Sequence, residues 1–412
     1  MRILMISDVY FPRINGVSTS IQTFRRSLHA AGHETVLVAP EYPAIAHGVR
    51  QEAAEGEILR VPSRYVPRDP EDRMMKIGAL RAVQRVLAQR SFDLVHIQTP
   101  FVAHYQGTAI ARRLGVPVIE SYHTYFEEYL HHYVPLMPRR LMRFVARRFT
   151  VSQCNVLDGL VVPSRPMQMT LARYGVRAPM RIIPTGMEMQ RLQRGDGARF
   201  RARLNIEPGR PTLVHVGRIA HEKNVDFLFR MMRHVVARKP EAVLIVAGEG
   251  PALGRCKVYA RSLGLVEHVR FVGYLSRDSE LLDCYCAGDL FVFASKTETQ
   301  GLVLLEAMAL GIPVVSTAYM GTEDIVRPQR GACLAPDDEE GFAAIVLALL
   351  DDPRRRAELA VEARRYAATW SADAMAARLE HFYAEIVERG ARWRRSSAAS
   401  RRAQDVQPGE GA

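Results

Sequence analysis

The 412-residue sequence contains little cysteine and no long apolar run. Its five cysteines are scattered, and the single close pair, Cys284 and Cys286, has neither the spacing of a redox motif nor that of a zinc site. We therefore expect free thiols in a reducing compartment rather than a disulfide framework. No apolar stretch approaches the roughly 18–20 residues that span a bilayer, so an integral membrane protein is not expected.

The beginning of the chain lacks the pattern of a cleavable signal peptide. The apolar run that starts at Ile3 is interrupted by Asp8 and followed by Pro12, and no small-residue cleavage site comes after it. The run instead indicates a first buried β-strand. We expect a cytoplasmic protein that is either soluble or peripheral on the inner face of the cell membrane.

An excess of basic residues gives the chain a formal net charge of +12. Nucleic acid, anionic lipid and simple solvation are the candidate explanations for this charge. The sequence has no zinc-finger, RRM or KH signature and no aromatic residues interleaved with basic ones, so we expect no nucleic-acid partner. An anionic membrane surface and simple solvation both stay open.

Short apolar runs rich in β-branched residues alternate with helical patterns along most of the chain, which predicts parallel sheets covered on both faces. The alternation stops after Ile182 and restarts at Thr212. We therefore expect an α/β protein with two doubly wound, Rossmann-like domains, residues 1–190 and 205–371, facing across a cleft. The expected strands are Ile3–Ser7, Thr35–Ala39, Leu94–Ile97, Val116–Glu120 and Gly159–Val162, then Thr212–Val216, Ala242–Ala247, His268–Val272, Leu290–Ala294 and Ile312–Ser316.

Two further expectations concern the ends of the domains. Ser18 is expected to cap a first helix that stops at Gly32. A last helix, Ala372–Glu388, is expected to pack back on the first domain. Residues 392–412 are rich in Arg, Ser, Ala and Gly without apolar periodicity, which predicts a disordered basic tail.

Two acidic residues, Glu298 and Glu306, flank a predicted helix start at Gly301. A strand ends at Ala294, so Glu298 lies at the carboxyl end of a parallel strand, where doubly wound sheets bind ligands. The free N–H groups of Gln300–Leu302 and the positive helix end form a site for a diphosphate. The two carboxylates can accept hydrogen bonds from the hydroxyls of a sugar and a ribose. The alternative is that Glu298 merely caps the helix and Glu306 is solvated.

A basic loop follows the first strand of the second domain. Gly217 lacks a Cβ, which lets a ligand approach closely, and the cations Arg218 and Lys223 come after it. Arginine offers a planar fork and lysine a point charge, and together they can neutralise a pyrophosphate leaving group. An exposed basic turn is the alternative.

The first domain offers two weaker candidates. Gly16 lies in the turn after the first strand, where its backbone could reach the same diphosphate, although turns need glycine in any case. His123 follows a strand end and therefore points at the cleft, and a structural histidine is the alternative. Gly248 and Gly250 approximate a dinucleotide fingerprint, but their spacing and place exclude NAD. We expect no cofactor and no metal ion, since no ligand cluster of the kind that hard cations need is present.

Residues 139–149 combine five arginines with apolar side chains and contain no acid. On a helical wheel the arginines fall mostly on one side and the apolar residues on the other, which is typical of a helix lying on an anionic membrane. The alternative is a surface helix whose apolar side packs on its own domain. The basic side comprises Arg139, Arg140, Arg143, Arg147 and Arg148, and the apolar side comprises Leu141, Met142, Phe144, Val145 and Phe149.

Together these motifs resemble the retaining glycosyltransferases of family 4, which have the GT-B fold. The resemblance is carried by the pair Arg218 and Lys223 and by the spacing Glu298-x7-Glu306, and it spans nearly the whole chain. One departure is Gln300-Gly301, where many members have Phe-Gly after the first glutamate.

The resemblance implies a role for each matching residue. A UDP- or GDP-hexose is the implied donor, whose diphosphate is held by Gly16, Arg218 and Lys223. Glu298 then holds the transferred sugar and Glu306 the ribose. His123 lies near the reacting centre of the donor sugar.

Longer runs look most like bacterial diacylglycerol α-glucosyltransferases, which implies a membrane glycerolipid as acceptor. This subfamily usually has His-Thr-His-Thr-Pro-Phe where the chain reads His96-Ile-Gln-Thr-Pro-Phe101, so a soluble or polysaccharide acceptor stays open. The runs are Phe11–Val17, His96–Phe101, Tyr122–Tyr129 and Thr297–Leu302.

The chemistry implied by the family retains the anomeric configuration. No residue stands out as a covalent nucleophile with a partner acid, so front-face transfer is the consistent hypothesis. Two alternatives come from other classes: a sugar-nucleotide epimerase or hydrolase of the same architecture, and a non-catalytic membrane-binding module. The donor base, the hexose, the linkage and the oligomeric state stay open.

Overall fold

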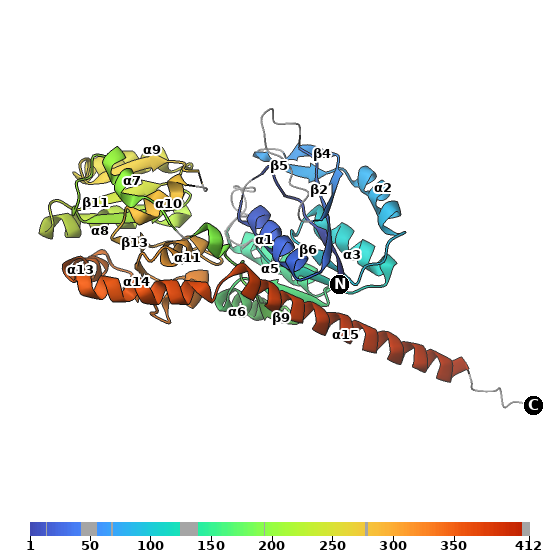
Figure 1. Ribbon diagram of the computed structural model, residues 1–412. Coiled ribbons are helices and arrows are strands. Elements are labelled where there is room, and N and C mark those ends of the chain that lie inside the picture. Colours follow the sequence, from blue (N-terminus) through green and yellow to red (C-terminus); the bar gives the residue numbers. More distant parts are fainter. Residues whose placement is uncertain are drawn as a thin grey trace, which may run out of the picture. The chain divides into compact units, whose positions relative to one another are not determined.

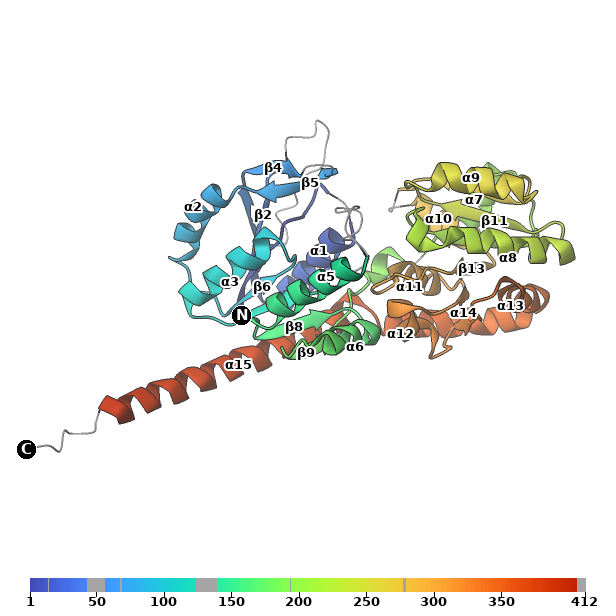
Figure 2. The ribbon, with the colours of Figure 1, turned by 180° about the vertical axis from the view of Figure 1, so that it is seen from behind.

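A computed structural model of the protein describes residues 1–13, 15–42, 56–66, 69–123, 139–192, 194–276 and 279–405. The chain divides into two compact units, coloured along the sequence in Figures 1 and 2. The first unit comprises Met1–Val162, Gln168–Ile183 and the chain from Met375 onward. The second unit comprises Pro163–Met167 and Pro184–Ala374.

The first unit is built on a parallel sheet of seven strands in the order β3-β2-β1-β6-β7-β8-β9. Helices cover the sheet, so the central strand β1 (Arg2–Ile6) has its last four side chains fully buried. The other strands are β2 (Glu34–Pro40), β3 (Glu57–Val61), β6 (Leu94–Ile97), β7 (Val118–Ser121), β8 (Gly159–Val162) and β9 (Met180–Ile182), and a separate hairpin joins β4 (Ser63–Val66) to β5 (Asp69–Met75). The helices are α1 (Gly16–Ala30), α2 (Ile77–Leu87), α3 (Val102–Leu114), α5 (Arg139–Cys154), α6 (Arg165–Tyr174) and α15 (Ala372–Asp405).

Helix α1 is capped by Asn15 and not by Ser18, the residue predicted. The Asn15 side chain accepts a hydrogen bond from the backbone N–H of Ser18 at 2.8 Å. This is the usual reach of a cap to the third residue beyond it. The Ser18 side chain is instead buried, and its hydroxyl has no hydrogen-bond partner among the described residues.

The last helix, α15, packs on the first unit. Phe382 and Ile386 lie against Gly159 at the start of β8, where an added Cβ would be 2.7 Å from the Phe382 ring. The missing side chain at Gly159 therefore lets the helix approach the sheet. The helix also continues to Asp405, well past Glu388 (Figure 1), so the first part of the expected disordered tail is helical.

The second unit contains a parallel sheet of six strands in the order β12-β11-β10-β13-β14-β15. Alternate residues of β10 and β11 enter two different buried apolar clusters, because successive side chains of a strand point to opposite faces. The strands are β10 (Thr212–Val216), β11 (Val243–Ala247), β12 (Val269–Gly273), β13 (Leu290–Phe293), β14 (Val314–Ser316) and β15 (Ala332–Leu334). The helices are α7 (Gly197–Arg203), α8 (Val225–Arg238), α9 (Leu253–Ser262), α10 (Glu280–Cys286), α11 (Leu302–Ala309), α12 (Glu323–Val326), α13 (Glu339–Asp351) and α14 (Pro353–Ala368).

The strand order of this second sheet reverses between β10 and β13. These two strands pair only at Leu213 with Leu290 and at Val214 with Phe291, so they part before their carboxyl ends. Such a reversal point is where doubly wound sheets bind their ligands. The prediction of two doubly wound, Rossmann-like domains is confirmed.

The main segment of the second unit begins at Pro184, earlier than the predicted residue 205. Met187 explains this start, because its N–H donates to the Trp370 carbonyl at 2.9 Å and its carbonyl accepts from Ala372 at 2.8 Å. At Gly186 an added Cβ would be 2.4 Å from the Cα of Ala372. Among the described helices, none is long and apolar enough to cross a bilayer.

Candidate functional site

Lys223 and Glu298 meet at the carboxyl edge of the second sheet. Lys223 lies in the loop after β10 and Glu298 in the loop after β13, and Lys223 Nζ is 2.6 Å from Glu298 Oε1. Their side chains are 17% and 20% exposed, so the pair is largely withdrawn from solvent without being closed off. Two residues 75 positions apart thus form a charged contact at the place where a doubly wound sheet binds ligand.

Arg218 belongs to the same loop as Lys223 but differs from it in its contacts. Its side chain is exposed, and the structure shows no ion pair or hydrogen bond between this guanidinium and any described residue. An exposed guanidinium can turn its planar fork toward an anion at little cost in desolvation.

The loop that contains Gly217 lies directly against the loop after β11. Gly217 N–H donates to the Ala247 carbonyl at 3.0 Å, and Ile219 N–H donates to the Glu249 carbonyl at 2.9 Å. An added Cβ at Gly248 would be 2.0 Å from the Gly217 oxygen, and one at Gly250 would be 2.3 Å from the Ile219 oxygen. Gly248 and Gly250 therefore serve this backbone packing, which accounts for their fingerprint-like spacing without a dinucleotide.

Gly217 itself is not required by packing within the protein. An added Cβ there would meet only the Nε2 atom of His215, at 3.7 Å, which is ordinary contact. The absence of a side chain at Gly217 leaves room above the loop, as expected where a ligand approaches the backbone.

His215 occupies the place where β10 and β13 separate. Its imidazole is fully buried and stacks on Phe293 at a centroid distance of 5.5 Å, and Nδ1 donates to the Val292 carbonyl at 3.2 Å. Burial lowers the pKa of His215 to about 4, so the ring is neutral at pH 7. Nε2 is then an acceptor, and it has no hydrogen-bond partner among the described residues.

Helix α11 begins as predicted. Gly301 caps it in the left-handed conformation with φ of +89°, and an added Cβ would be 2.8 Å from Thr322. Leu302 is its first helical residue, so the unpaired N–H groups of the first turn lie beside Glu298 in sequence.

The side chain of Gln300 is engaged within the second unit. Its buried side-chain amide accepts from the Thr185 N–H and donates to the Thr185 carbonyl, both at 2.8 Å. The side chain therefore attaches the chain at Thr185 to the second unit and is not available to a donor. Only the backbone of Gln300 is left for the predicted contribution to donor binding.

Glu306 lies in the second turn of α11. The Tyr285 hydroxyl donates to its Oε2 atom at 2.7 Å, and the Tyr285 ring is fully buried. A rigid phenol thus orients the carboxylate, which is half-buried rather than simply solvated.

In the first unit, Gly16 and His123 lie at the carboxyl ends of β1 and β7. Gly16 is the first residue of α1, and nothing lies within 4 Å of the Cβ it lacks, so the fold does not require glycine there. His123 is half-buried, and its Nε2 atom is 3.3 Å from Gln98 Oε1. Burial lowers the pKa of His123 to about 4, so this imidazole is neutral as well.

Helix α5 does not divide as the helical wheel predicts. Met142 and Ala146 are buried, whereas Leu141, Phe144 and Val145 are exposed by 49%, 62% and 41%. The inward side is therefore narrow, and an apolar strip stays exposed between the basic residues. Exposed arginines of this helix are Arg140, Arg143, Arg147 and Arg148, whereas the side chain of Arg139 lies outside the described residues.

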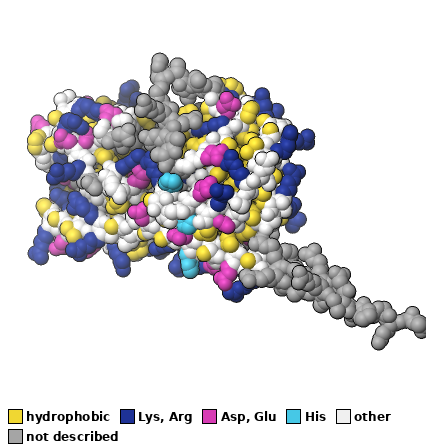
Figure 3. Space-filling view, turned by 45° about the vertical axis from the view of Figure 1, so that its right-hand side comes forward, with side chains coloured by type: hydrophobic (Ala, Val, Ile, Leu, Met, Phe, Trp, Pro, Cys, Tyr) yellow, Lys and Arg dark blue, Asp and Glu magenta, His cyan; other side chains and the backbone are white. Residues whose placement is uncertain are grey.

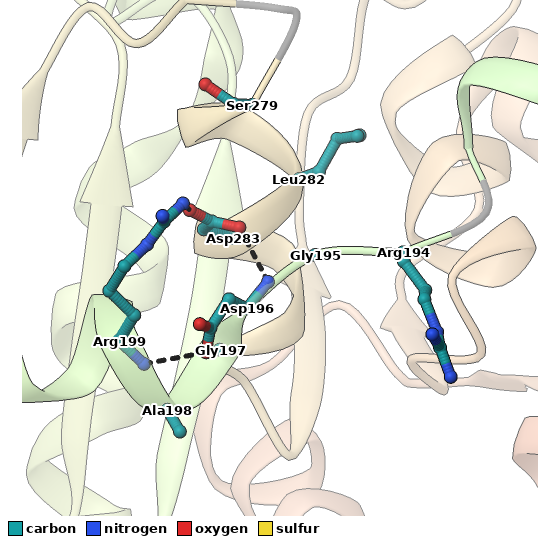
Figure 4. A pocket seen from close by; sticks show the side chains of 9 residues that line it. All are labelled: Arg194, Gly195, Asp196, Gly197, Ala198, Arg199, Ser279, Leu282 and Asp283. Atoms are coloured by element: carbon teal, nitrogen blue, oxygen red, sulfur yellow. Dashed lines mark hydrogen bonds and ion pairs between the residues drawn. The ribbon is translucent and has the colours of Figure 1, made fainter.

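A hollow of about 640 Å³ lies elsewhere in the second unit, between the start of α7 and α10 (Figure 4). Its carboxylate, Asp283, accepts from the Asp196 N–H at 2.6 Å and pairs with Arg199. An added Cβ at Gly195 or Gly197 would be 2.3 or 2.0 Å from carbonyl oxygens of α10. The hollow marks the junction of the two helices, and none of the predicted donor residues lines it.

Two family models match the chain: Glycosyltransferase Family 4 over residues 14–191 and Glycosyl transferases group 1 over residues 196–366. Alpha-monoglucosyldiacylglycerol synthase of Streptococcus pneumoniae is 31% identical over 360 residues, covering 86% of this chain and 79% of that protein. The chain belongs to glycosyltransferase family 4. It is therefore a glycosyltransferase, as the motifs predict.

Two other similar proteins are named with different nucleotides. A GDP-mannose-dependent alpha-mannosyltransferase of Mycobacterium tuberculosis is 27% identical over 342 residues, covering 82% of this chain and 85% of that protein. A crystal structure of Anabaena Alr3699/HepE in complex with UDP has a TM-score of 0.75 at 17% identity, covering 93% of this chain and 100% of that chain. This likeness confirms the GT-B fold.

Three side chains that contact the predicted site residues were not singled out from the sequence. His215 could have been found, because it is a polar residue inside the apolar strand Thr212–Val216. Tyr285 has no such signal, because it and Glu306 lie 21 residues apart in two different helices. Gln98 did have one, because it stands where the resembling subfamily usually has the second histidine of His-Thr-His-Thr-Pro-Phe.

Proposed function

We propose that this glycosyltransferase moves a hexose from a nucleoside diphosphate sugar to a hydroxyl of a membrane glycerolipid, with retention of the anomeric configuration. The observation that carries the proposal is the ion pair of Lys223 and Glu298 at the reversal point of the second sheet. A cation for the diphosphate and a carboxylate for sugar hydroxyls stand side by side there.

The donor is held from several elements of the chain. Arg218, Lys223 and the N-terminus of α11 bind the diphosphate, and the backbone at Gly217, Gln300 and Leu302 lies close to it. Glu298 accepts hydrogen bonds from hydroxyls of the transferred sugar. Glu306, oriented by Tyr285, accepts those of the ribose.

The transfer proceeds on one face of the sugar. The bond between the anomeric carbon and the phosphate oxygen breaks with its electron pair going to the phosphate, whose charge Arg218 and Lys223 stabilise. The acceptor hydroxyl then forms the new bond from the same face and gives its proton to the departing phosphate oxygen. Neither Glu298 nor Glu306 acts as nucleophile, and no metal ion takes part.

The lipid acceptor is supported by two observations. The relative from Streptococcus pneumoniae is named for a glucosylated diacylglycerol product. Helix α5 exposes Leu141, Phe144 and Val145 beside a row of arginines, which is the composition of a helix that rests on an anionic bilayer. We propose that this helix holds the protein on the membrane that contains its acceptor.

A panel of UDP- and GDP-hexoses, each offered with diacylglycerol vesicles or with soluble sugar acceptors, tests the function by mass spectrometry. One donor is expected to give an α-linked glycosyl diacylglycerol, with the anomer read by proton NMR and with the same yield in EDTA. Free or isomerised hexose without transfer would identify a hydrolase or an epimerase. Glycosylation of the soluble acceptors alone would contradict the lipid acceptor.

A further inference from the structure

Gln98 lies against His123 in the first unit. The two residues follow the neighbouring parallel strands β6 and β7, and Gln98 Oε1 is 3.3 Å from His123 Nε2. Gln98 is 3% exposed, and its backbone N–H donates to the Ile6 carbonyl at 2.9 Å. A buried amide on an anchored backbone is a rigid partner for the imidazole.

The hydrogen bond determines which nitrogen of His123 carries the proton. Burial keeps the ring neutral by lowering its pKa to about 4, and a neutral imidazole has one N–H donor and one acceptor. The amide oxygen of Gln98 can only accept. The proton therefore lies on Nε2, and Nδ1 keeps its lone pair.

No charged side chain competes with Gln98 for this ring among the described residues. The imidazole of His96 below it is engaged by the Tyr383 hydroxyl at 2.7 Å and the Ser121 hydroxyl at 2.9 Å, and burial lowers its pKa to about 3. The carboxylates of this sheet edge bond elsewhere: Asp8 to Thr99 and the Ala103 N–H, and Glu120 to His104.

We propose that Gln98 is a positioning residue that holds His123 as the Nε2–H tautomer, so that Nδ1 accepts a hydrogen bond from a substrate hydroxyl. The inference rests on the proposed sugar transfer for its purpose but not for its geometry. Under this assignment His123 is neither an acid nor a cation during transfer. It orients a hydroxyl of the hexose or of the acceptor near the reacting carbon.

The tautomer can be observed directly, without any substrate. Long-range proton–nitrogen NMR of histidine-labelled protein, with His123 assigned by the loss of its signals in His123→Asn, distinguishes the two neutral forms. The native protein is expected to show the Nε2–H form alone between pH 6 and pH 8. Gln98→Leu is expected to mix the two tautomers, and Gln98→Glu to raise the pKa of His123, since a carboxylate favours the imidazolium.

In the transfer assay, the same two variants show whether Gln98 positions His123 or only stabilises the fold. Gln98→Leu should lower kcat about tenfold at every pH with a smaller change in donor KM, the usual cost of one misplaced hydrogen bond. Gln98→Glu should move the acid limb of the kcat profile to higher pH and recover activity in alkali. Gln84→Glu is the matched control, because Gln84 on α2 is a buried amide that is hydrogen-bonded to Gln106 and Arg113 on α3.

The substrate hydroxyl that binds Nδ1 of His123 is identified by following the Nδ1 chemical shift in three titrations. These use the nucleoside diphosphate, the intact donor and the acceptor. A change in the Nδ1 shift on adding the donor but not the nucleoside diphosphate assigns it to the hexose, and a change with the acceptor assigns it to the acceptor. An unchanged His123 tautomer and pKa in Gln98→Leu and Gln98→Glu would overturn the proposal. A chain that transfers no sugar, yet shows the expected NMR changes, would contradict the proposed function and leave the positioning intact.

Discussion

Lys223 and Glu298 keep only 17% and 20% of their side-chain surfaces exposed, and their contact at 2.6 Å joins two loops of one sheet edge. Withdrawing two charges from water is costly unless the remaining donors and acceptors also find partners. A bound diphosphate would take the other N–H groups of Lys223, and sugar hydroxyls would take the second oxygen of Glu298. The pair is thus arranged for a ligand with an anionic end and a hydroxylated end.

Replacing Lys223 with alanine tests the role of the cation on the leaving group. We expect Lys223→Ala to lower kcat about 100-fold or more while donor binding weakens much less, since the charge it stabilises develops during the reaction. Steady-state kinetics with a titrated donor measure both. Lys239→Ala, which removes another ion pair of the same unit, is the control, and an unchanged kcat in Lys223→Ala would rule out the leaving-group role.

Alanine substitutions at two glycines after β11 are expected to change the free energy of unfolding in opposite directions. Gly248 has φ of +127° and no room for a Cβ beside the Gly217 oxygen, whereas Gly254 in α9 has nothing within 4 Å. Gly248→Ala should lower the free energy of unfolding by about 1–3 kcal/mol and weaken nucleoside diphosphate binding, because the loop with Gly217 must shift. Gly254→Ala should raise the free energy of unfolding by up to about 1 kcal/mol. Denaturant titration measures both, and equal effects of the two substitutions would be inconsistent with this packing.

At the scale of the elements, strands with continuous apolar runs are predictable from the sequence. The bounds of β6, β8 and β10 agree with prediction, since every residue of these strands is buried. Strand β3 was missed because Glu57 and Arg60 interrupt its pattern, and β9 and β15 because three residues carry no periodicity.

The candidate site was predictable in part for a similar reason. Strand ends meet at one sheet edge, so the proximity of Lys223 and Glu298 follows from topology. The hydrogen bond of the Gln300 side-chain amide with Thr185 does not follow from topology. Thr185 lies 115 residues away in a chain segment with no regular structure. The helical wheel was wrong for α5 because only Met142, Ala146 and Thr150 are buried among residues 140–150, whose side chains the structure describes.

The exposed strip on α5 is the surface that we propose contacts lipid. Phe144→Asp should reduce partition onto vesicles with anionic lipid about tenfold or more, since an apolar side chain worth roughly 2 kcal/mol is replaced by a repelled charge. The thermal midpoint should stay unchanged, because Phe144 is 62% exposed. Vesicle co-sedimentation measures the effect. Val258→Asp on α9, also exposed, is the control, and equal losses in both variants would contradict a specific role for α5.

At the scale of the whole molecule, Lys and Arg side chains are spread over the visible surface rather than gathered in one patch (Figure 3). The net charge of +12 therefore does not by itself mark a partner's binding site. Three histidines are more informative, because both units withdraw neutral imidazoles from solvent: His96 and His215 are buried and His123 is half-buried. Burial lowers the pKa of His96 to about 3 and those of His123 and His215 to about 4.

These histidines make the protein less stable as the pH falls. Their folded pKa values lie below the ordinary 6.5, so between pH 6.5 and 4 the unfolded chain binds more protons and stability falls as pH falls. Asp8, whose pKa burial raises to about 6, and Glu120, also raised, act in the opposite direction. The midpoint of thermal unfolding should drop from pH 7 to pH 5, and His215→Asn should reduce that drop. A midpoint independent of pH, or the same drop in both proteins, would contradict the buried neutral state of His215.

We propose that Glu298 holds the transferred sugar while Arg218, Lys223 and the start of α11 hold the diphosphate. Isothermal titration of Glu298→Ala with UDP and GDP, beside a transfer assay with the intact donor, tests it most directly. We expect a nucleoside diphosphate Kd within about threefold of the native value and transfer reduced about 100-fold or more. Glu267→Ala, at an exposed site of the same unit, should change neither. Retained transfer in Glu298→Ala, or loss of nucleoside diphosphate binding equal to the loss of transfer, would contradict it.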